Sequence, residues 1–319
     1  MSERTLKVGV IGCGRIARPH LSNLRSSPAA SIVAVCDVRP EAAKQAAEPT
    51  SAAVFTDPLA MLEAVEMDAV YVLTPTPTHG DLGAAVLGSG RHLMLEKPLA
   101  ANLEEADRLV EEADRSGKVA TVGHQWRYLK GAERARELLD GAPLALVHAW
   151  YYWTWPLVGW IAEKATGGGQ MLDQGIHLLD LARHVAGEVS DATARYTLAA
   201  RAAQGFPNWD AQVLHGRFSS GALLDVAVTY ALFPQVSEQP TVDFIGNEVL
   251  VRVTPKWTEV HRSGETAIFY EPGNPMTELD KAFVSACPSE DPLAVRSTLT
   301  DARESLAIVM KANTSAGVE

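Results

Sequence analysis

The amino-acid sequence predicts two domains: a parallel α/β domain, followed by an α+β domain built on a large, mostly antiparallel open sheet. The length of 319 residues exceeds that of most single domains. Short apolar runs alternate with helix-like segments through the first third of the chain, which favours βαβ units and a parallel sheet. After Gly123 the pattern changes to longer runs of alternating polar and apolar residues, which are typical of antiparallel strands.

Apolar runs rich in Val, Ile and Leu predict the strands of the first domain at Lys7–Ile11, Ile32–Cys36, Ala69–Leu73, His92–Leu95 and Val119–Val122. The segments between them have helical spacing, at Ile16–Leu24, Glu41–Glu48, Pro58–Val65, Asp81–Leu87 and Leu103–Arg115. Three of these helices also follow residues that favour a helix start, namely Asp57, Thr78 and Asn102. Each parallel pair of strands therefore has a helix available for its crossover.

The second domain begins with a predicted helix at Gly131–Leu139. Its predicted strands are Leu144–Trp153, Ala192–Leu198, Ala211–Phe218, Ala222–Tyr230, Thr241–Ile245, Val249–Val253 and Ala267–Phe269. Tight turns are expected at Ser219-Ser220-Gly221 and Gly246-Asn247, and further helices at Met171–Val185 and Thr300–Ala312. We place the boundary between Gly123 and Gly131, which gives domains of residues 1–124 and 125–319.

Composition excludes several classes of protein. The chain is 47% hydrophobic and 21% charged, so it can bury a sizeable core. Its net charge of −11 provides no basic surplus for nucleic acid, and no apolar run is long enough to span a membrane. The segment Met1–Lys7 has no signal-peptide pattern, and Cys13, Cys36 and Cys287 are isolated and lack metal-type spacing. We expect a cytoplasmic protein with neither a nucleic-acid nor a membrane partner.

The first strand ends in a glycine-rich turn, Gly12-Cys13-Gly14-Arg15-Ile16-Ala17, that opens a helix. Gly12 permits the tight turn, and Gly14 allows the backbone to approach a pyrophosphate without a Cβ in the way. The free N–H groups at the helix start then bind the anion. Glycine turns also close ordinary strand–helix corners, but the βαβ context favours a Rossmann dinucleotide-binding domain.

Asp37, at the end of the second strand, is placed to accept hydrogen bonds from the ribose hydroxyls of a dinucleotide. A carboxylate there repels a 2′-phosphate, so NAD is preferred over NADP as the predicted cofactor. Arg39 lies two residues further along and could pair with a phosphate. The alternative for Arg39, a solvated loop residue, is the one we favour.

The fifth strand ends in Glu96-Lys97-Pro98, at the edge where open α/β sheets bind ligands. Pro98 restricts Lys97 to an extended conformation. An ammonium group in such a cleft can donate to a substrate hydroxyl and stabilise developing negative charge on its oxygen. The alternative is a surface Glu–Lys pair.

In the second domain, Gly167-Gly168-Gly169 leads into a helix on which Asp173 and His177 are one turn apart. An imidazole can take the proton of an alcohol as hydride leaves the same carbon, and Asp173 could orient it. Two alternatives remain open. Asp180 and His184 share overlapping helical faces with this pair, so a divalent-metal site is conceivable; otherwise the pair is a helix cap and a core histidine.

These motifs occur together in the order found in one family. They are the glycine turn, Asp37, Thr74-Pro75-Thr76-Pro77-Thr78-His79, Glu96-Lys97-Pro98 and the segment from Gly167 to Asp180. Over nearly its whole length the chain resembles the glucose–fructose oxidoreductase / inositol dehydrogenase / rhizopine-catabolism (Gfo/Idh/MocA) family. The resemblance implies a Rossmann domain followed by an α+β substrate-binding and oligomerisation domain. It also implies a homodimer or homotetramer, and the C-terminal helix could pack back on the first domain.

The resemblance assigns Lys97, His177 and Asp173 as catalytic residues. Together with the reasoning above, it gives a cofactor-binding set of Gly12, Gly14, Arg15, Ile16, Asp37, Arg39, Thr74, Pro75, Thr76, His79, Glu96 and Lys97. Thr76 departs from the family pattern, because asparagine is common there, so contacts from that loop to the nicotinamide are less secure.

Aromatic residues cluster just before the glycines, at Trp150, Tyr151, Tyr152, Trp153, Trp155 and Trp160. Their faces could stack on sugar rings, although on a strand they could equally form a subunit interface. The predicted substrate-binding set is Lys97, Arg127, Trp160, Lys164, Gln170, Asp173 and His177. For Arg127 the alternative is an ion pair at the domain interface.

The function predicted is an NAD(P)-dependent dehydrogenase acting on a CH–OH group of a sugar, polyol or related compound. In one rival, an NAD-dependent glycosidase or lyase oxidises its sugar transiently, so that no NADH accumulates. In the other, a dinucleotide-binding sensor has no catalysis, but the presence of both Lys97 and His177 argues against it.

Overall fold

The computed structural model describes residues 5–156, 158–233 and 239–318. The chain divides into two compact units. The first comprises the described residues of Met1–Gln125 together with Pro275–Arg303, and the second those of Trp126–Asn274 together with Glu304–Glu319. Residues 1–4 of the segment examined for a targeting signal lie outside the described part. Within that part, no helix combines the length and apolarity needed to cross a membrane.

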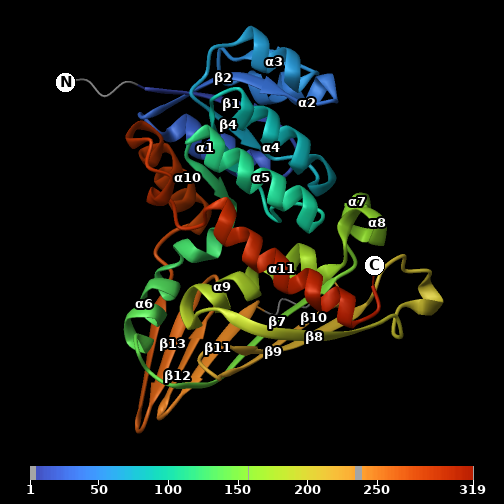
Figure 1. Ribbon diagram of the computed structural model, residues 1–319, viewed down its shortest axis with the longest axis vertical. Coiled ribbons are helices and arrows are strands. Elements are labelled where there is room, and N and C mark those ends of the chain that lie inside the picture. Colours follow the sequence, from blue (N-terminus) through green and yellow to red (C-terminus); the bar gives the residue numbers. More distant parts are fainter. Residues whose placement is uncertain (1–4, 157, 234–238, 319) are drawn as a thin grey trace. The chain divides into compact units, whose positions relative to one another are not determined.

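The first unit contains a parallel sheet of six strands in the order β3-β2-β1-β4-β5-β6 (Figure 1). Its strands are β1 Leu6–Ile11, β2 Ala30–Cys36, β3 Ala53–Phe55, β4 Ala69–Val72, β5 His92–Leu95 and β6 Ala120–Val122. Its helices are α1 Ala17–Ser26, α2 Pro40–Ala47, α3 Pro58–Ala64, α4 His79–Gly88, α5 Leu103–Ser116 and α10 Pro275–Ala286, with single turns at Thr76–Thr78, Cys287–Ser289 and Pro292–Ala294. Because all strands run the same way, the loops that follow them meet at one edge of the sheet.

Two of the three predicted helix caps form. The Asp57 carboxylate accepts hydrogen bonds from the first N–H groups of α3, and the Asn102 side chain accepts one from Glu105 at the start of α5. Thr78 does not cap α4; its hydroxyl oxygen instead lies 2.7 Å from Thr74 Oγ1 and 2.8 Å from the Pro75 carbonyl oxygen. A turn at Thr76–Thr78 precedes α4 and redirects this side chain.

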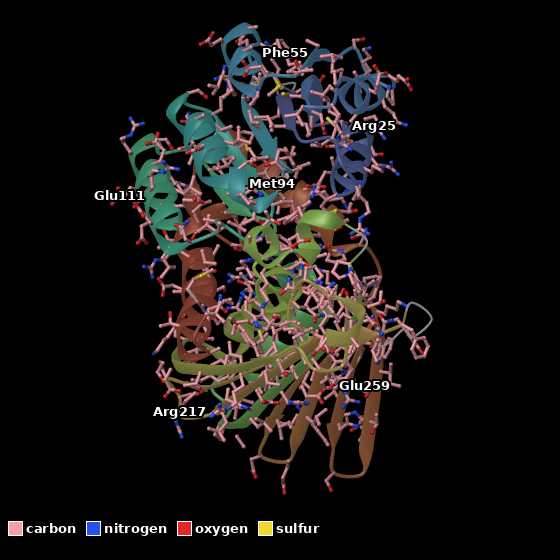
Figure 2. The ribbon with its side chains drawn as sticks, turned by 90° about the vertical axis from the view of Figure 1, so that its right-hand side faces the viewer. Arg25, Phe55, Met94, Glu111, Arg217 and Glu259 are labelled. Atoms are coloured by element: carbon pink, nitrogen blue, oxygen red, sulfur yellow. The ribbon has the colours of Figure 1, made fainter. Side chains whose placement is uncertain are left out.

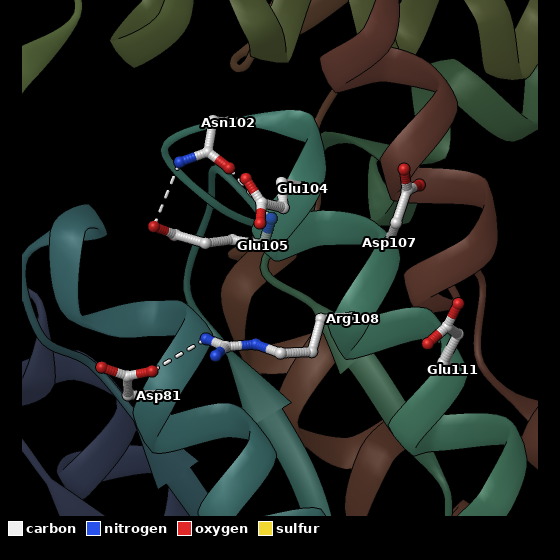
Figure 3. A pocket seen from close by; sticks show the side chains of 7 residues that line it. All are labelled: Asp81, Asn102, Glu104, Glu105, Asp107, Arg108 and Glu111. Atoms are coloured by element: carbon white, nitrogen blue, oxygen red, sulfur yellow. Dashed lines mark hydrogen bonds and ion pairs between the residues drawn. The ribbon is translucent and has the colours of Figure 1, made fainter.

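The outer faces of α4 and α5 are joined by polar contacts. Figure 3 shows Arg108 of α5 reaching Asp81 of α4, at 2.8 Å, and Asn102 bonded to Glu105. These side chains line a shallow acidic hollow together with Glu104, Asp107 and Glu111. Four of its lining side chains, Asp81, Asn102, Glu105 and Arg108, therefore already serve helix capping or helix–helix pairing.

The second unit is built on a sheet of eight strands in the order β14-β13-β12-β11-β7-β10-β9-β8. Its strands are β7 Leu144–Thr154, β8 Val189–Thr197, β9 Ala211–Phe218, β10 Leu223–Leu232, β11 Thr241–Gly246, β12 Val249–Val253, β13 Trp257–Arg262 and β14 Glu265–Tyr270. All neighbouring strands pair antiparallel except β7 with β10. The predicted fold class is therefore confirmed. Strand β3 was not predicted because it has only three residues, and β13 was not predicted because most of its residues are polar or charged.

Helix α9, Ile176–Ala186, packs against β7 and β11 and so covers one face of this sheet. The other helices of the unit are α6 Lys130–Leu139, α7 Gly159–Ala162 and α8 Lys164–Gly167, with single turns at Gln125–Tyr128 and Ala202–Gln204. The last helix, α11 Leu299–Ser315, starts in the first unit and ends in the second. The regular helix predicted from Met171 begins instead with a π-helical turn, Met171–Gly175.

Each unit has its own apolar core. In the first, Met94 of β5 is fully buried inside the parallel sheet, whereas Glu111 extends outward from α5 (Figure 2). Tyr71 of β4 is also fully buried and packs edge-on against Phe283 of α10, with ring centroids 5.4 Å apart. Helix α10 therefore completes the core of the first unit although it lies far along the chain.

Candidate active site

The glycine turn lies at the carboxyl edge of the parallel sheet, between β1 and α1. Gly12 has φ +91°, and a Cβ there would lie 2.6 Å from the Leu73 carbonyl oxygen, so no other residue fits. A Cβ on Gly14 would meet nothing within 4 Å, which leaves its backbone open to a ligand. No side chain caps α1, where Arg15 and Ile16 are exposed, so its first N–H groups remain available to an anion.

Asp37 follows β2 and is joined to this turn. One carboxylate oxygen accepts a hydrogen bond from the Cys13 amide at 2.9 Å, and the other accepts one from the Arg39 amide. The Arg39 guanidinium, itself mostly exposed, also donates to both oxygens. Burial opposes ionisation, but these hydrogen bonds outweigh it and lower the pKa of Asp37. Asp37 is therefore a fixed carboxylate beside the glycine turn.

The Cys13 thiol lies in the same turn and adds no charge to it. Burial, reinforced by the neighbouring Asp37 carboxylate, raises the pKa of Cys13 to about 12. Because the thiol is neutral, it does not offset the partial positive charge at the N-terminus of α1.

The loop after β4 carries Thr74, Pro75, Thr76 and His79. Thr74 is half-buried and Pro75 exposed, whereas Thr76 is buried. His79 is fully buried, and its ring nitrogens lie 2.8 Å from the Pro98 carbonyl and 2.9 Å from that of Thr74. Burial lowers the pKa of His79. Its ring thus ties this loop to the segment that carries Lys97.

Glu96 and Lys97 follow β5 at the same edge. The buried Glu96 carboxylate accepts a hydrogen bond from the Lys97 amide at 3.0 Å, and the Lys97–Pro98 peptide bond is cis. A Cβ on Gly123 would lie 2.9 Å from the same carboxylate, so a glycine is needed there. The Lys97 side chain is half-buried. Its backbone is fixed by the hydrogen bond from the Lys97 amide to Glu96.

On its other side Glu96 meets His20 of α1. The His20 ring lies between two carboxylates, with Nε2 3.4 Å from Glu96 Oε1 and Nδ1 2.7 Å from Asp280 Oδ1. All three side chains are buried. Burial by itself would lower the pKa of His20, but the hydrogen bonds and charges of Asp280 and Glu96 raise it to about 9.

We expect the free energy of unfolding to fall as the pH rises from about 6.5 to about 9. The stabilisation from the His20 proton is complete below its unfolded pKa of 6.5 and is lost as the pH passes its folded pKa of about 9. The change amounts to at most about 3 kcal/mol. Urea unfolding at several pH values measures it, and His20→Gln should flatten the dependence. Equal slopes in the two proteins would assign the effect to other groups.

In the second unit, the three glycines lead into the segment that carries Asp173 and His177. A Cβ on Gly167 would lie 2.3 Å from the Ile161 carbonyl oxygen, and Gly168 and Gly169 both have positive φ. Asp173 lies in the π-helical turn and His177 in the first turn of α9. Turns of π-helix are rare in proteins, but those that occur are often found at functional sites. The sequence spacing alone predicted a regular helix here.

His177 and Asp173 are each supported by an aromatic residue. The His177 ring stacks on Trp126, with centroids 5.1 Å apart, and Trp126 stacks on Tyr151 of β7. Asp173 accepts a hydrogen bond from the Tyr230 hydroxyl at 3.2 Å. Burial and the Asp173 charge raise the pKa of Tyr230, which keeps this phenol a donor. No sequence motif singles out Trp126 or Tyr230, because only strand pairing and packing bring them next to His177 and Asp173.

Arg127 and Asp180 form a buried ion pair within the second unit. The guanidinium donates to both carboxylate oxygens, at 2.7 and 2.6 Å, and Ser305 donates to Asp180 as well. Arg183 in turn donates to Ser305. The substrate role of Arg127 stays a prediction. Among the described residues, no group of three or more His, Cys, Asp and Glu side chains could hold a metal ion.

The remaining substrate candidates lie around the glycines. Gln170 is buried, and its amide group donates to the Tyr151 carbonyl and to Gln174. Trp160 of α7 is half-buried, and the exposed Lys164 places its ammonium 4.5 Å from the centre of the Trp209 ring. Trp209 also lies against Gly169, where a Cβ would come within 3.0 Å of it. Trp209 is a further aromatic residue of this region that the sequence did not single out.

Strand alternation divides the aromatic cluster of β7. The Tyr151 ring stacks on Trp126, which stacks on His177 of α9, whereas Trp150 packs with His148 and Tyr152 on the opposite face. Trp155, beyond the strand, packs edge-on against Phe206. The aromatic residues of β7 therefore lie on both faces of the sheet: Tyr151 on the face covered by α9, and Trp150 and Tyr152 on the opposite face.

Comparison with known proteins agrees with this arrangement. Residues 6–124 match the model of an oxidoreductase family described as an NAD-binding Rossmann fold, and residues 133–250 match the GFO/IDH/MocA C-terminal domain. The chain belongs to the GFO/IDH/MocA oxidoreductase family. The family and the Rossmann dinucleotide-binding domain predicted from the sequence are thereby confirmed.

Three known proteins illustrate the similarity. The chain is 30% identical to a myo-inositol 2-dehydrogenase of Thermotoga maritima over 57% of its own length and 55% of that protein. It is 29% identical to a D-glucoside 3-dehydrogenase of Escherichia coli K12, over 83% of its length and 82% of that protein. An oxidoreductase of Agrobacterium radiobacter, solved with NAD+, L-tartaric acid and magnesium, has the same fold, with a TM-score of 0.86, 20% identity and coverage of 98% and 97%.

Proposed function

We propose that this GFO/IDH/MocA protein is an NAD(P)-dependent dehydrogenase that oxidises a secondary alcohol of a sugar, a polyol or a related compound. The observation that carries the proposal is the anchoring of Lys97. Its amide is bound by Glu96 at the same sheet edge as the open Gly12–Gly14 turn and the fixed Asp37 carboxylate. The names of the two dehydrogenases above, which act on an inositol and a glucoside, support this substrate class.

The residues of the first unit fit a dinucleotide. The Gly14 backbone and the uncapped start of α1 would hold its pyrophosphate, with Arg15 and Ile16 alongside. Asp37 would hold its adenosine ribose, and Arg39, Thr74, Pro75, Thr76, His79 and Glu96 would form or support the wall of the site. When bound, the nicotinamide supplies the acceptor or donor for hydride.

The chain's own residues would manage the proton and the charge. The Lys97 ammonium donates to the substrate oxygen and stabilises the negative charge that grows on it. His177 takes the hydroxyl proton onto a ring nitrogen during oxidation and returns it during reduction. Asp173, which accepts a hydrogen bond from Tyr230, would orient His177 or a second substrate hydroxyl. Residues 1–124 would thus supply the cofactor contacts and Lys97, and residues 125–319 would supply His177, Asp173 and the remaining substrate contacts.

The remaining substrate contacts would come from Trp160, Lys164, Gln170 and Arg127. Trp160 offers an aromatic face to a sugar ring, and Lys164 and Gln170 offer donors for hydroxyl groups. Arg127 would contribute through its ion pair with Asp180, which fixes the start of the second unit against α9.

We further propose a cytoplasmic homodimer or homotetramer. The unpaired state of all three cysteines supports that location, and the exposed Trp153 and Tyr270 support association through the sheet.

A direct assay tests the function. Purified protein is given NAD or NADP with inositols, aldoses and sugar acids, and the absorbance of reduced nicotinamide is followed. Steady accumulation of NADH with at least one ring polyol or sugar supports the proposal. Substrate consumption without NADH would favour transient oxidation by a glycosidase or lyase. Failure to bind either dinucleotide would refute the proposal.

Asp37→Asn should narrow the preference for NAD over NADP by about tenfold, which corresponds to about 1.4 kcal/mol. The variant keeps the shape of the side chain but removes the charge that would repel a 2′-phosphate. Dissociation constants for both dinucleotides measure the change. Asp81→Asn, a substitution in an exposed ion pair of the same unit, is the control. An unchanged ratio in Asp37→Asn would assign cofactor selectivity to another residue.

A further inference from the structure

We propose that His20 is a positioning residue for Lys97: its doubly protonated ring ties the Glu96 carboxylate to Asp280, and Glu96 in turn holds the Lys97 amide. This inference rests on the proposed function, because it affects catalysis only if Lys97 acts on the substrate. The three side chains come from α1, from the segment after β5, and from α10.

The geometry favours a proton on each ring nitrogen of His20. Nδ1 lies 2.7 Å from an Asp280 oxygen, and Nε2 lies 3.4 Å from a Glu96 oxygen. A neutral imidazole has one N–H, so it would leave a ring lone pair directed at a carboxylate. The two carboxylates therefore favour the imidazolium, and the elevated pKa of about 9 agrees with this. The bridge is charged at neutral pH.

The ring and its Asp280 partner have further contacts that fix them in place. The second Asp280 oxygen accepts a hydrogen bond from Asn23 at 2.7 Å. Tyr71 of β4 packs edge-on against His20, with centroids 5.7 Å apart, and Phe283 packs behind Tyr71. The titratable groups that face His20 are thus Asp280 from α10, Glu96 from the end of β5 and Tyr71 from β4.

The His20 bridge acts on Lys97 through the Glu96 carboxylate. Glu96 Oε1 faces His20, while Oε2 accepts the Lys97 amide. Since Glu96 is buried, loss of the imidazolium would leave its carboxylate short of a partner and free to turn toward the space beside Gly123. The Lys97 amide would then lose its acceptor, and the ammonium would no longer be held within the tolerance that catalysis needs.

His20→Gln tests the bridge, because an amide is neutral and carries both of its N–H groups on one nitrogen, so it cannot replace the separate donors Nδ1 and Nε2. We expect the Lys97 amide to exchange its hydrogen at least about tenfold faster. We also expect kcat for a substrate found in the assay above to fall about 10–100-fold, with KM and the NAD dissociation constant nearly unchanged. His92→Gln is the matched control, since His92 is a buried histidine of the same unit that accepts the Val119 amide. It should leave Lys97 exchange and kcat within about threefold of wild type.

Asp280→Asn provides a second test that does not depend on the folding of His20→Gln. It keeps the side-chain shape and an acceptor for His20 but removes one negative charge. We expect its kcat to approach wild type at pH 6.5 and to decline at a pH at least about one unit lower than in wild type, because His20 loses its proton earlier.

The possible outcomes distinguish a failure of the proposed His20–Glu96 bridge from a failure of the proposed dehydrogenase function. Wild-type exchange at Lys97 in His20→Gln, or superimposable pH profiles for Asp280→Asn and wild type, would overturn the inference. Faster exchange with unchanged kcat would support the bridge and reject Lys97 as catalytic. If wild type oxidises nothing in the assay, the proposed function fails, while the exchange measurement still decides whether His20 positions Lys97.

Discussion

Lys97→Ala should lower kcat by about 10²–10⁴-fold while changing the NAD dissociation constant by less than about threefold. The ammonium is the group that would stabilise negative charge on the substrate oxygen, so its loss acts on the transition state rather than on cofactor binding. The backbone is undisturbed, because Glu96 binds the main-chain amide of residue 97 and not its side chain. Steady-state kinetics and a dinucleotide titration make the measurement.

Two further variants sharpen this result. Lys97→Arg keeps the positive charge but replaces a compact ammonium by a planar fork, so it should recover only part of the activity. Lys118→Ala removes another lysine of the same unit, one that pairs with Glu290 at the surface, and should leave kcat unchanged. Near wild-type turnover in Lys97→Ala would remove this residue from the mechanism.

His177→Asn should also lower kcat by about 10²–10⁴-fold, because an amide cannot exchange a proton with the substrate hydroxyl. His177→Phe is the companion variant, since it preserves a ring stacked on Trp126 and removes both nitrogens. Equal losses in the two variants would show that proton transfer, rather than ring packing, is what His177 supplies. The kcat and the melting temperature of each variant are measured together.

The control for His177 lies on the same helix. His184→Asn changes a histidine two turns further along α9, next to Arg136, and should leave kcat within about threefold of wild type. If His177→Phe retained wild-type activity, the general acid–base role would have to be assigned elsewhere.

Local pattern was enough to predict the fold class and the positions of the motifs. The strands that carry Gly12, Asp37 and Lys97 are continuous apolar runs, and their periodicity does not depend on distant residues. Strand β3 escaped prediction because it has only three residues, and β13 because most of its residues are polar or charged. Both are held by pairing with a neighbouring strand.

Long-range packing accounts for what the sequence could not predict. His20 and Asp280 are 260 residues apart, and no local pattern indicates that they meet. The same holds for Tyr230 and Asp173, 57 residues apart. The π-helical turn at Met171–Gly175 depends on glycine packing against Ile161, Trp209 and Gln212, which periodicity does not report.

The discontinuity of the first unit has a consequence for synthesis of the protein. Its six-stranded sheet is complete once residue 125 has been made, yet Asp280 and Phe283 of α10 are translated only after the entire second sheet. A nascent chain therefore holds His20 and Tyr71 without their final neighbours while about 150 intervening residues leave the ribosome. The core of the first unit can therefore be completed only after α10 has been made, and a fragment cut at the domain boundary lacks Asp280 and Phe283.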